Sequence, residues 1–214
     1  MLHSLSMKGI SDYQVYGKGK RHVYIIGGED CASSFPLSFP DTVFVSIKVE
    51  EWNRYLSPYK AENPFRKGEF FEGEGDVLLS SIKDELVPRV ENNEDDIQRY
   101  LVGYSMGGLF SLYASTFPNI WKGIGSVSGS LWFDGFDEYI SSHIPYSQKI
   151  YLSLGRKEKE SRNRVLKTVE DKTKVISNTL ISAGKDCTLI LNEGGHFQDE
   201  EKRIRDAVSY LLRE

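Results

Sequence analysis

Apolar residues along this chain form two kinds of pattern, short β-prone runs and longer stripes at helical spacing. The stripes predict helices over Asp76–Val90, Ser105–Phe117, Arg164–Ala183 and Glu200–Leu212, with Pro88 leaving the end of the first one open. The β-prone runs predict strands at Leu5–Lys8, Tyr13–Tyr16, His22–Ile26, Val43–Val49, Tyr100–Val102, Ile124–Ser128, Lys149–Leu154 and Thr188–Leu191. Strands that alternate with helices predict an α/β fold, with a mostly parallel central sheet covered by helices on both faces and early strands antiparallel at one edge.

No internal repeat, low-complexity tract or linker divides the chain. We therefore expect a single domain over residues 1–214, a length that supports one sizeable core. In sheets of this type, ligands bind beyond the carboxyl ends of the strands. The residues that follow each predicted strand are therefore the candidates for chemistry.

Composition narrows the class of protein. Hydrophobic residues make up 39% of the chain, charged residues 27%, and the net charge is -4, as in a soluble globular protein. Neither nucleic acid nor an anionic membrane is an expected partner. The first residues lack the apolar run of a signal peptide, and Cys31 and Cys187 are too few for a disulfide framework or a metal cluster. We expect a cytoplasmic protein with reduced cysteines and leave its oligomeric state open, a homo-oligomer included.

The stretch around Ser105 is the strongest motif. Gly103-Tyr104-Ser105-Met106-Gly107 fits G-x-S-x-G, with a predicted strand before it and a predicted helix after it. This context is typical of a nucleophile elbow, in which the serine sits on a sharp turn between strand and helix. Ser105 is therefore the predicted nucleophile.

A serine alcohol near neutral pH needs an adjacent imidazole to take its proton. His196 lies in the glycine-rich loop between the last predicted strand and the last helix, at the active edge of the sheet. His3 and His22 stand at or before strand starts, on the wrong side of the sheet, and His143 stands beside Ile144-Pro145, where a surface or capping role fits better. His196 is the predicted base.

The third predicted member is a carboxylate that orients the histidine. The segment after Lys149–Leu154 reads Gly155-Arg156-Lys157-Glu158-Lys159-Glu160. Glu158 is our first choice and Glu160 the second, with Asp134, in the loop after Ile124–Ser128, the third. The same charge pattern also fits a solvated helix start, so the choice stays open here.

Acyl transfer also requires backbone donors for the oxyanion. The N–H of Met106, directly after the nucleophile, is one predicted donor. The other should come from the loop after His22–Ile26, where we choose the N–H of Gly28 with Glu29 as the neighbouring option. Gly27-Gly28 would also suit an ordinary turn.

Aromatic residues follow two of the predicted strands at the same edge. Trp132 follows the small-residue strand, and Trp52 follows Val43–Val49. Either would suit a pocket for an apolar or aromatic group, although a core position fits Trp52 slightly better. The stretch Tyr59–Gly75 is expected to be irregular and to form a rim, with no separate lid.

Taken together, Gly-Tyr-Ser-Met-Gly-Gly-Leu, Ser-Gly-Ser-Leu-Trp-Phe, Gly-Arg-Lys-Glu and Gly-Gly-His-Phe resemble the esterase family of the α/β-hydrolase superfamily that contains esterase D, feruloyl esterase domains and the enterochelin esterases. The resemblance covers nearly the whole chain. It implies an α/β-hydrolase fold and carboxylic-ester hydrolysis without metal or cofactor, with Ser105 as nucleophile, His196 as base and Glu158 as acid. The chain has Ile-Gly-Gly-Glu where the family commonly has His-Gly, and Glu where esterase D and the feruloyl esterases usually have Asp.

Two classes of function follow. The first is a serine esterase that acts on small acyl or aryl esters through an acyl-enzyme, with trilactone siderophores of the enterochelin type as the alternative substrates. The second is a non-catalytic protein of the same fold used for binding. The joint presence of Ser105, His196 and a nearby carboxylate argues against the second class.

Overall fold

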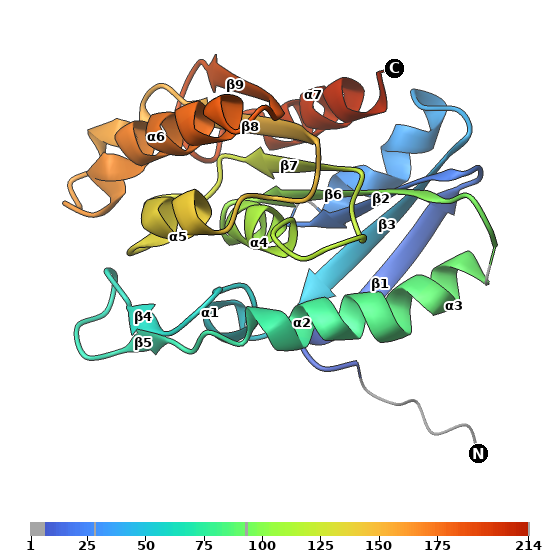
Figure 1. Ribbon diagram of the computed structural model, residues 1–214, viewed down its shortest axis with the longest axis horizontal. Coiled ribbons are helices and arrows are strands. Elements are labelled where there is room, and N and C mark those ends of the chain that lie inside the picture. The colour runs from blue at the N-terminus through green and yellow to red at the C-terminus, as the bar shows by residue number, and fades with distance from the viewer. Residues whose placement is uncertain (1–6, 28, 93, 214) are drawn as a thin grey trace.

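The computed structural model describes residues 7–27, 29–92 and 94–213. These residues form a seven-stranded sheet in the order β1-β3-β2-β6-β7-β8-β9 (Figure 1). Strand β1 pairs antiparallel with β3 at one edge, and all other neighbours are parallel. The strands are β1 (Ile10–Gly17), β2 (Arg21–Ile26), β3 (Thr42–Val49), β6 (Gln98–Tyr104), β7 (Gly123–Val127), β8 (Lys149–Gly155) and β9 (Asp186–Asn192). The predicted mostly parallel sheet with an antiparallel edge is confirmed.

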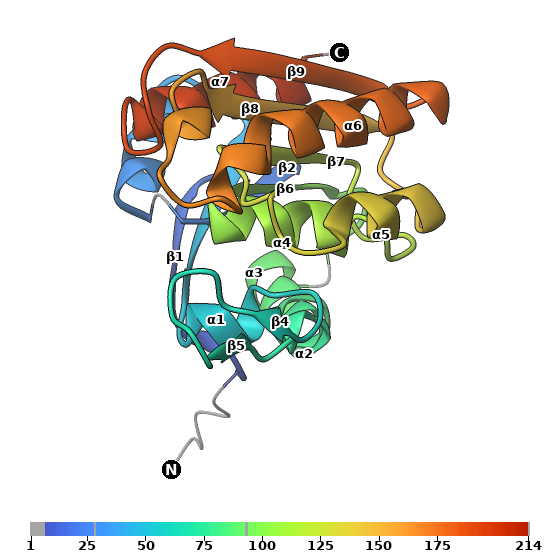
Figure 2. The same cartoon turned by 90° about the vertical axis from the view of Figure 1, so that its left-hand side faces the viewer.

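Helices cover both faces of this sheet, as Figures 1 and 2 show together. One face carries α1 (Trp52–Tyr55), α2 (Gly75–Ser81), α4 (Met106–Ala114), α5 (Phe136–Ser142) and α6 (Val169–Ser182). The other face carries the 3-10 helix η1 (Glu29–Leu37) and α7 (Glu200–Leu212). The 3-10 turns η3 (Glu158–Glu160) and η4 (Leu166–Thr168) precede α6, and the hairpin β4 (Ala61–Glu62) with β5 (Phe70–Phe71) lies beside α1.

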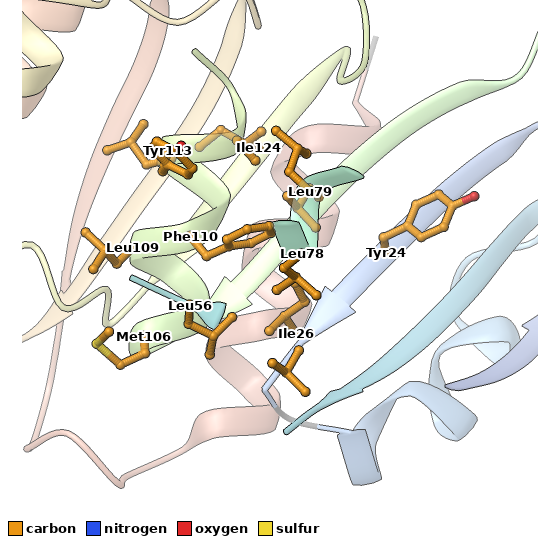
Figure 3. Packing of buried hydrophobic residues seen from close by; sticks show 14 of the residues in the cluster. Tyr24, Ile26, Leu56, Leu78, Leu79, Met106, Leu109, Phe110, Tyr113 and Ile124 are labelled. Atoms are coloured by element: carbon orange, nitrogen blue, oxygen red, sulfur yellow. The ribbon is translucent and has the colours of Figure 1, made fainter. Parts of the chain in front are cut away.

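Alternate residues of the central strands enter two separate halves of the core. On β2, Tyr24 and Ile26 pack in the half beneath α2 and α4, whereas Val23 and Ile25 pack in the half beneath α7 and η1. A parallel strand covered on both faces has no solvent side, which is why β2 reads as a continuous apolar run. Figure 3 shows the first half, with Phe110 of α4 beside Leu78 and Leu79 of α2.

The helical segment predicted over Asp76–Val90 is continuous but contains an irregular turn. It runs as α2, then the π-helix η2 (Ile82–Leu86), then α3 (Val87–Glu91). Pro88 has no N–H to donate to the carbonyl one turn earlier, and the wider turn, in which the Val87 N–H donates to the Ile82 carbonyl, directly precedes it. The proline is therefore accommodated inside the helix, and the helix ends at Glu91.

Other predicted elements differ in detail. The strand predicted at Leu5–Lys8 is wrong for Met7 and Lys8, which lie in a turn. Leu5 and Ser6 fall outside the described residues. The stretch expected to be irregular, Tyr59–Gly75, contains the β4–β5 hairpin. The sequence analysis missed α1 and α5, which are too short to display a helical period, and the 3-10 helix η1, whose period differs from that of an α-helix.

Phe110 provides a test of this core. Its side chain is fully buried, so Phe110→Ala should lower the free energy of unfolding by about 3–5 kcal/mol through lost apolar contact and the cavity left behind. Urea denaturation followed by circular dichroism measures the change. Leu37→Ala, at a position 93% exposed, is the control and should stay within about 0.5 kcal/mol of wild type. Equal effects of the two substitutions would contradict this description of the core.

Candidate active site

The turn between β6 and α4 holds Ser105 in a strained conformation. Its φ of 57° and ψ of −120° lie outside the regions that non-glycine residues favour. A Cβ at Gly103 would stand 1.9 Å from the Gly107 carbonyl oxygen, and a Cβ at Gly107 would stand 2.4 Å from the Ile26 carbonyl oxygen. Only glycine permits this close crossing of strand and helix.

Backbone hydrogen bonds fix the serine in this turn. The N–H of Ser105 donates to the Val127 carbonyl at 3.0 Å, and the Ser105 carbonyl accepts from the N–H of Ser130 at 3.0 Å. The hydroxyl oxygens of Ser105 and Ser130 lie 3.5 Å apart. The elbow is therefore tied to the end of β7 as well as to its own helix, and the Ser105 hydroxyl projects beyond the carboxyl end of β6.

His196 reaches Ser105 from the loop between β9 and α7. Its Nε2 lies 3.0 Å from the Ser105 Oγ, and its Nδ1 lies 2.7 Å from Oε2 of Glu158. The arrangement fits an imidazole whose Nδ1–H donates to the carboxylate while Nε2 accepts from the serine hydroxyl. Because β6, β8 and β9 are parallel, the segments after them meet at one edge of the sheet and bring these three side chains together.

The carboxylate of Glu158 is buried and well supplied with donors. Its Oε1 accepts the backbone N–H of Gly155 at 2.7 Å. Burial by itself raises the pKa of Glu158, but the hydrogen bond and charge interaction with His196, together with donors from Gly155 and Ser128, outweigh it and lower the pKa overall. Glu158 is therefore ionised near neutral pH and can hold the imidazole in one orientation.

The other candidates have different neighbours. Glu160 is exposed beside the cavity, and Asp134 is exposed and uses its backbone carbonyl to accept the Tyr59 hydroxyl. His22 lies at the opposite end of the sheet, where its Nε2 contacts the Gly19 carbonyl, and His143 stacks on Tyr139. His3 falls outside the described residues. Among the described side chains, Glu158 is the carboxylate that contacts His196.

The two predicted oxyanion donors differ in what can be said of them. Met106 is the first residue of α4, so its N–H has no acceptor one turn earlier in the helix. Gly28 falls outside the described residues. Its neighbour Gly27 packs against Tyr104, the residue before Ser105. A Cβ at Gly27 would stand 3.2 Å from the Tyr104 carbonyl oxygen. Gly27, which directly follows β2, therefore lies beside the residue before Ser105, and the choice of Gly28 as donor stays a prediction.

A cavity of about 600 Å³ opens in front of Ser105 and His196. Both predicted tryptophans line it: Trp132 is mostly buried, whereas Trp52 is half-exposed with its indole N–H bound to the Val49 carbonyl. The core position that seemed slightly better for Trp52 from the sequence is therefore wrong. Phe65 of the rim stacks edge-on against Trp132, and Phe197, 87% exposed, stands beside His196.

The sequence analysis missed several residues of this site. Phe65 and Phe197 line the cavity, the Tyr104 hydroxyl donates to the His196 carbonyl, and the Arg203 guanidinium lies against Glu158. Phe197 directly follows the predicted base and could have been found by that position. Tyr104 stands inside the motif around Ser105, but the motif does not indicate its contact with the His196 loop. Phe65 and Arg203 lie in segments distant in the sequence, and no local pattern marks them.

Within the described ranges, no group of three or more His, Cys, Asp or Glu side chains is placed to hold a metal ion. The same part of the chain contains no helix long and apolar enough to cross a membrane.

Comparison with known proteins gives one curated relative and many similar folds. The relative, "Uncharacterized protein YbbA" of Bacillus subtilis (strain 168), is 29% identical over 152 residues, which are 68% of this chain and 61% of that protein. The match therefore spans less than two thirds of the relative's length.

Two solved structures illustrate the fold. The IroE-like serine hydrolase from Shewanella oneidensis aligns with a TM-score of 0.75 at 18% identity, over 92% of this chain and 73% of that one. The siderophore hydrolase EstA from Aspergillus nidulans aligns with a TM-score of 0.71 at 18% identity, over 96% of this chain and 92% of that one. At these identities the likeness shows a shared fold, the α/β-hydrolase fold.

Sequence comparison with family models is more direct. The model of the family described as "Putative esterase" matches residues 38–186, more than half of the chain, including the elbow and Glu158. The protein therefore belongs to this esterase family of the α/β-hydrolase fold.

Proposed function

We propose that this protein is a serine carboxylic-ester hydrolase, with Ser105 as nucleophile, His196 as general base and Glu158 as the acid that orients it. The observation that carries the proposal is the continuous chain from the Ser105 Oγ to the His196 Nε2 at 3.0 Å and from the His196 Nδ1 to the Glu158 Oε2 at 2.7 Å. These distances suit proton transfer without rearrangement of the three side chains.

The geometry allows the usual two half-reactions. The Ser105 Oγ attacks the ester carbonyl carbon while the His196 Nε2 accepts its proton, and the carbonyl oxygen becomes an oxyanion. The N–H of Met106 and, in the proposal, that of Gly28 stabilise this oxyanion. The His196 imidazolium then protonates the leaving alcohol, and water, deprotonated by the same nitrogen, releases the acid from the acyl-enzyme.

Small acyl or aryl esters are the proposed substrates. The cavity presents Trp52, Phe65, Trp132 and Phe197 around the nucleophile. Aromatic walls of this kind favour an apolar or aromatic group over a charged one. The proposal includes residence in the cytoplasm, for which the low number of cysteines is the sequence argument, and a single domain of 214 residues.

Hydrolysis of a trilactone siderophore is the second candidate. EstA, which has the same fold, is named a siderophore hydrolase, and the open, aromatic cavity of about 600 Å³ would admit one aryl arm of a larger ligand. Purified protein incubated in parallel with enterochelin and with p-nitrophenyl butyrate separates the two. A kcat/KM higher by orders of magnitude for the trilactone, followed by mass spectrometry of the linear product, would select the second candidate.

For the site, the first prediction concerns the nucleophile. Ser105→Ala should abolish labelling by a fluorophosphonate probe and lower p-nitrophenyl butyrate turnover by several orders of magnitude, because the attacking oxygen is removed. Ser141→Ala, at an exposed serine of α5, is the matched control and should label like wild type. Persistent labelling of Ser105→Ala would overturn the assignment. Inactivity of the wild type on every ester tested would favour the non-catalytic alternative.

The second prediction concerns the acid. Glu158→Gln should preserve the fold and lower kcat by about 10²- to 10⁴-fold, because the amide favours the wrong imidazole tautomer. Glu160→Gln and Asp134→Asn are the controls and should change kcat less than about two-fold, because neither carboxylate contacts His196 among the described contacts. Steady-state kinetics on one ester suffices. Full activity in all three variants would mean that the enzyme uses a Ser–His dyad.

The third prediction concerns the aromatic cavity. Phe65→Ala and Phe197→Ala should each lower kcat/KM for a phenyl or naphthyl ester by about 5- to 30-fold, since each ring contributes about 1–2 kcal/mol of apolar contact. The loss should be smaller for an acetate ester whose leaving alcohol has the same pKa but carries no aromatic ring. Tyr146→Ala, at an exposed aromatic away from the cavity lining, is the control. An equal loss on both substrates would show that the rings stabilise the loops and do not contact the substrate.

A further inference from the structure

Arg203 of α7 is a buried cation beside the proposed triad. Its side chain is 1% exposed, and its guanidinium makes four contacts. Nη2 donates to the carbonyls of Glu193 and Gly195, both at 2.9 Å. Nη1 donates to the Ser128 hydroxyl at 2.9 Å and lies 3.5 Å from Oε1 of Glu158. One planar group therefore joins the loop that carries His196, the end of β7 and the acid.

Burial of a guanidinium is costly unless its charge and its donors are matched. If Arg203 served only to pack α7 against the sheet, an apolar side chain would suffice, as Ile204 and Val208 of the same helix show. The fork of an arginine instead suits several acceptors held in one plane. The position of this cation, in contact with the carboxylate that orients His196, points to a role in the reaction.

We propose that Arg203 is a positioning residue that acts through Glu158 and the His196 loop, an inference that rests on the proposed triad of Ser105, His196 and Glu158.

The first part of this role is geometric. The loop from Glu193 to His196 contains Gly194 and Gly195, and glycine loses more conformational freedom on ordering than other residues. Arg203 holds the carbonyls of Glu193 and Gly195, and the Tyr104 hydroxyl holds the carbonyl of His196 itself. The imidazole therefore reaches Ser105 from a loop whose carbonyls are held by side chains of other segments.

The second part is electrostatic. The Ser128 hydroxyl accepts from Arg203 and donates to Glu158, so the cation supports the ionised carboxylate directly and through one hydroxyl. The charge of Arg203 also interacts with three other titratable groups, Tyr104, Tyr151 and Lys202. Burial raises the pKa of both phenols, that of Tyr151 to about 12, and Lys202 is exposed and paired with Asp206, so none of the three titrates in an assay between pH 5 and 9.

The test compares Arg203→Met, which removes the fork and the charge, with Arg203→Lys, which keeps the charge alone. For Arg203→Met we expect kcat to fall about 10- to 100-fold with KM nearly unchanged. The acidic limb of kcat/KM should also move to higher pH, because removal of a buried positive charge beside the triad favours the protonated forms of nearby groups. Arg203→Lys should lose about 10-fold in kcat but keep the acidic limb close to that of wild type.

Arg205→Met is the matched control, because Arg205 follows on the same helix and pairs at the surface with Glu201 and Ser38. It should leave kcat and the pH profile unchanged. Thermal unfolding is measured on every variant, because a purely structural role would lower the melting temperature while leaving KM, the acidic limb and the kcat of the folded fraction as in wild type. That outcome for Arg203→Met would overturn the proposal.

A third variant covers the case in which Arg203→Met does not fold. Ser128→Gly suits the φ of 44° at this position and removes the side chain whose hydroxyl lies between Arg203 and Glu158. Like Arg203→Lys, it should lower kcat with KM within about two-fold of wild type. Unchanged kcat in both would overturn the proposal. An active wild type whose activity survives Ser105→Ala would instead contradict the proposed triad, so the two failures are distinguishable.

Discussion

The close crossing of β6 and α4 is the constraint on which the site depends. Gly103 faces the Gly107 carbonyl, and Gly107 faces the Ile26 carbonyl of β2. Because neither glycine has a Cβ, the chain can turn from strand to helix within one residue, and that residue is Ser105. The strained serine backbone is held by hydrogen bonds to Val127 and Ser130 and by the fully buried helix behind it. Strain of this kind persists only where the surrounding structure over-determines it. The packing of α4 against the sheet therefore helps to fix the position of the Ser105 side chain.

The parallel order of the strands brings the other residues of the site to Ser105. Ser105 and His196 are 91 residues apart in the sequence, yet each lies just beyond the carboxyl end of a strand in the same sheet. Glu158 follows β8, which lies between β7 and β9. A right-handed βαβ connection returns the chain to the same edge each time, so every loop after a strand is a candidate for the site. The elbow supplies one fixed point, and the sheet order decides which other loops can reach it.

Electrostatics at this edge is organised around the buried carboxylate of Glu158. Hydrogen bonds from Gly155 and Ser128 and the contact with His196 outweigh the cost of burying it. The guanidinium of Arg203 lies on the far side of the same carboxylate. Buried charges of opposite sign are better tolerated when they lie in one hydrogen-bonded network. The aromatic cavity opens in front of Ser105 and His196.

The sequence by itself determined whatever depends on local spacing and sterics. The periodicities predicted the sheet strands from Tyr13 onward and the principal helices, and the glycines around Ser105 predicted the turn, because both effects act within a few residues. The order of motifs also singled out His196 and Glu158, but left Glu160 and Asp134 as alternatives. Only the tertiary structure shows which of the three carboxylates contacts His196, because that contact depends on strand order and on the path of the β8 loop. Arg203 and Phe65 could not be predicted at all, since their contacts join segments whose separation in the sequence carries no local signal. The contacts of these residues depend on where the fold places them, and that placement depends on the order of all the strands in the sheet.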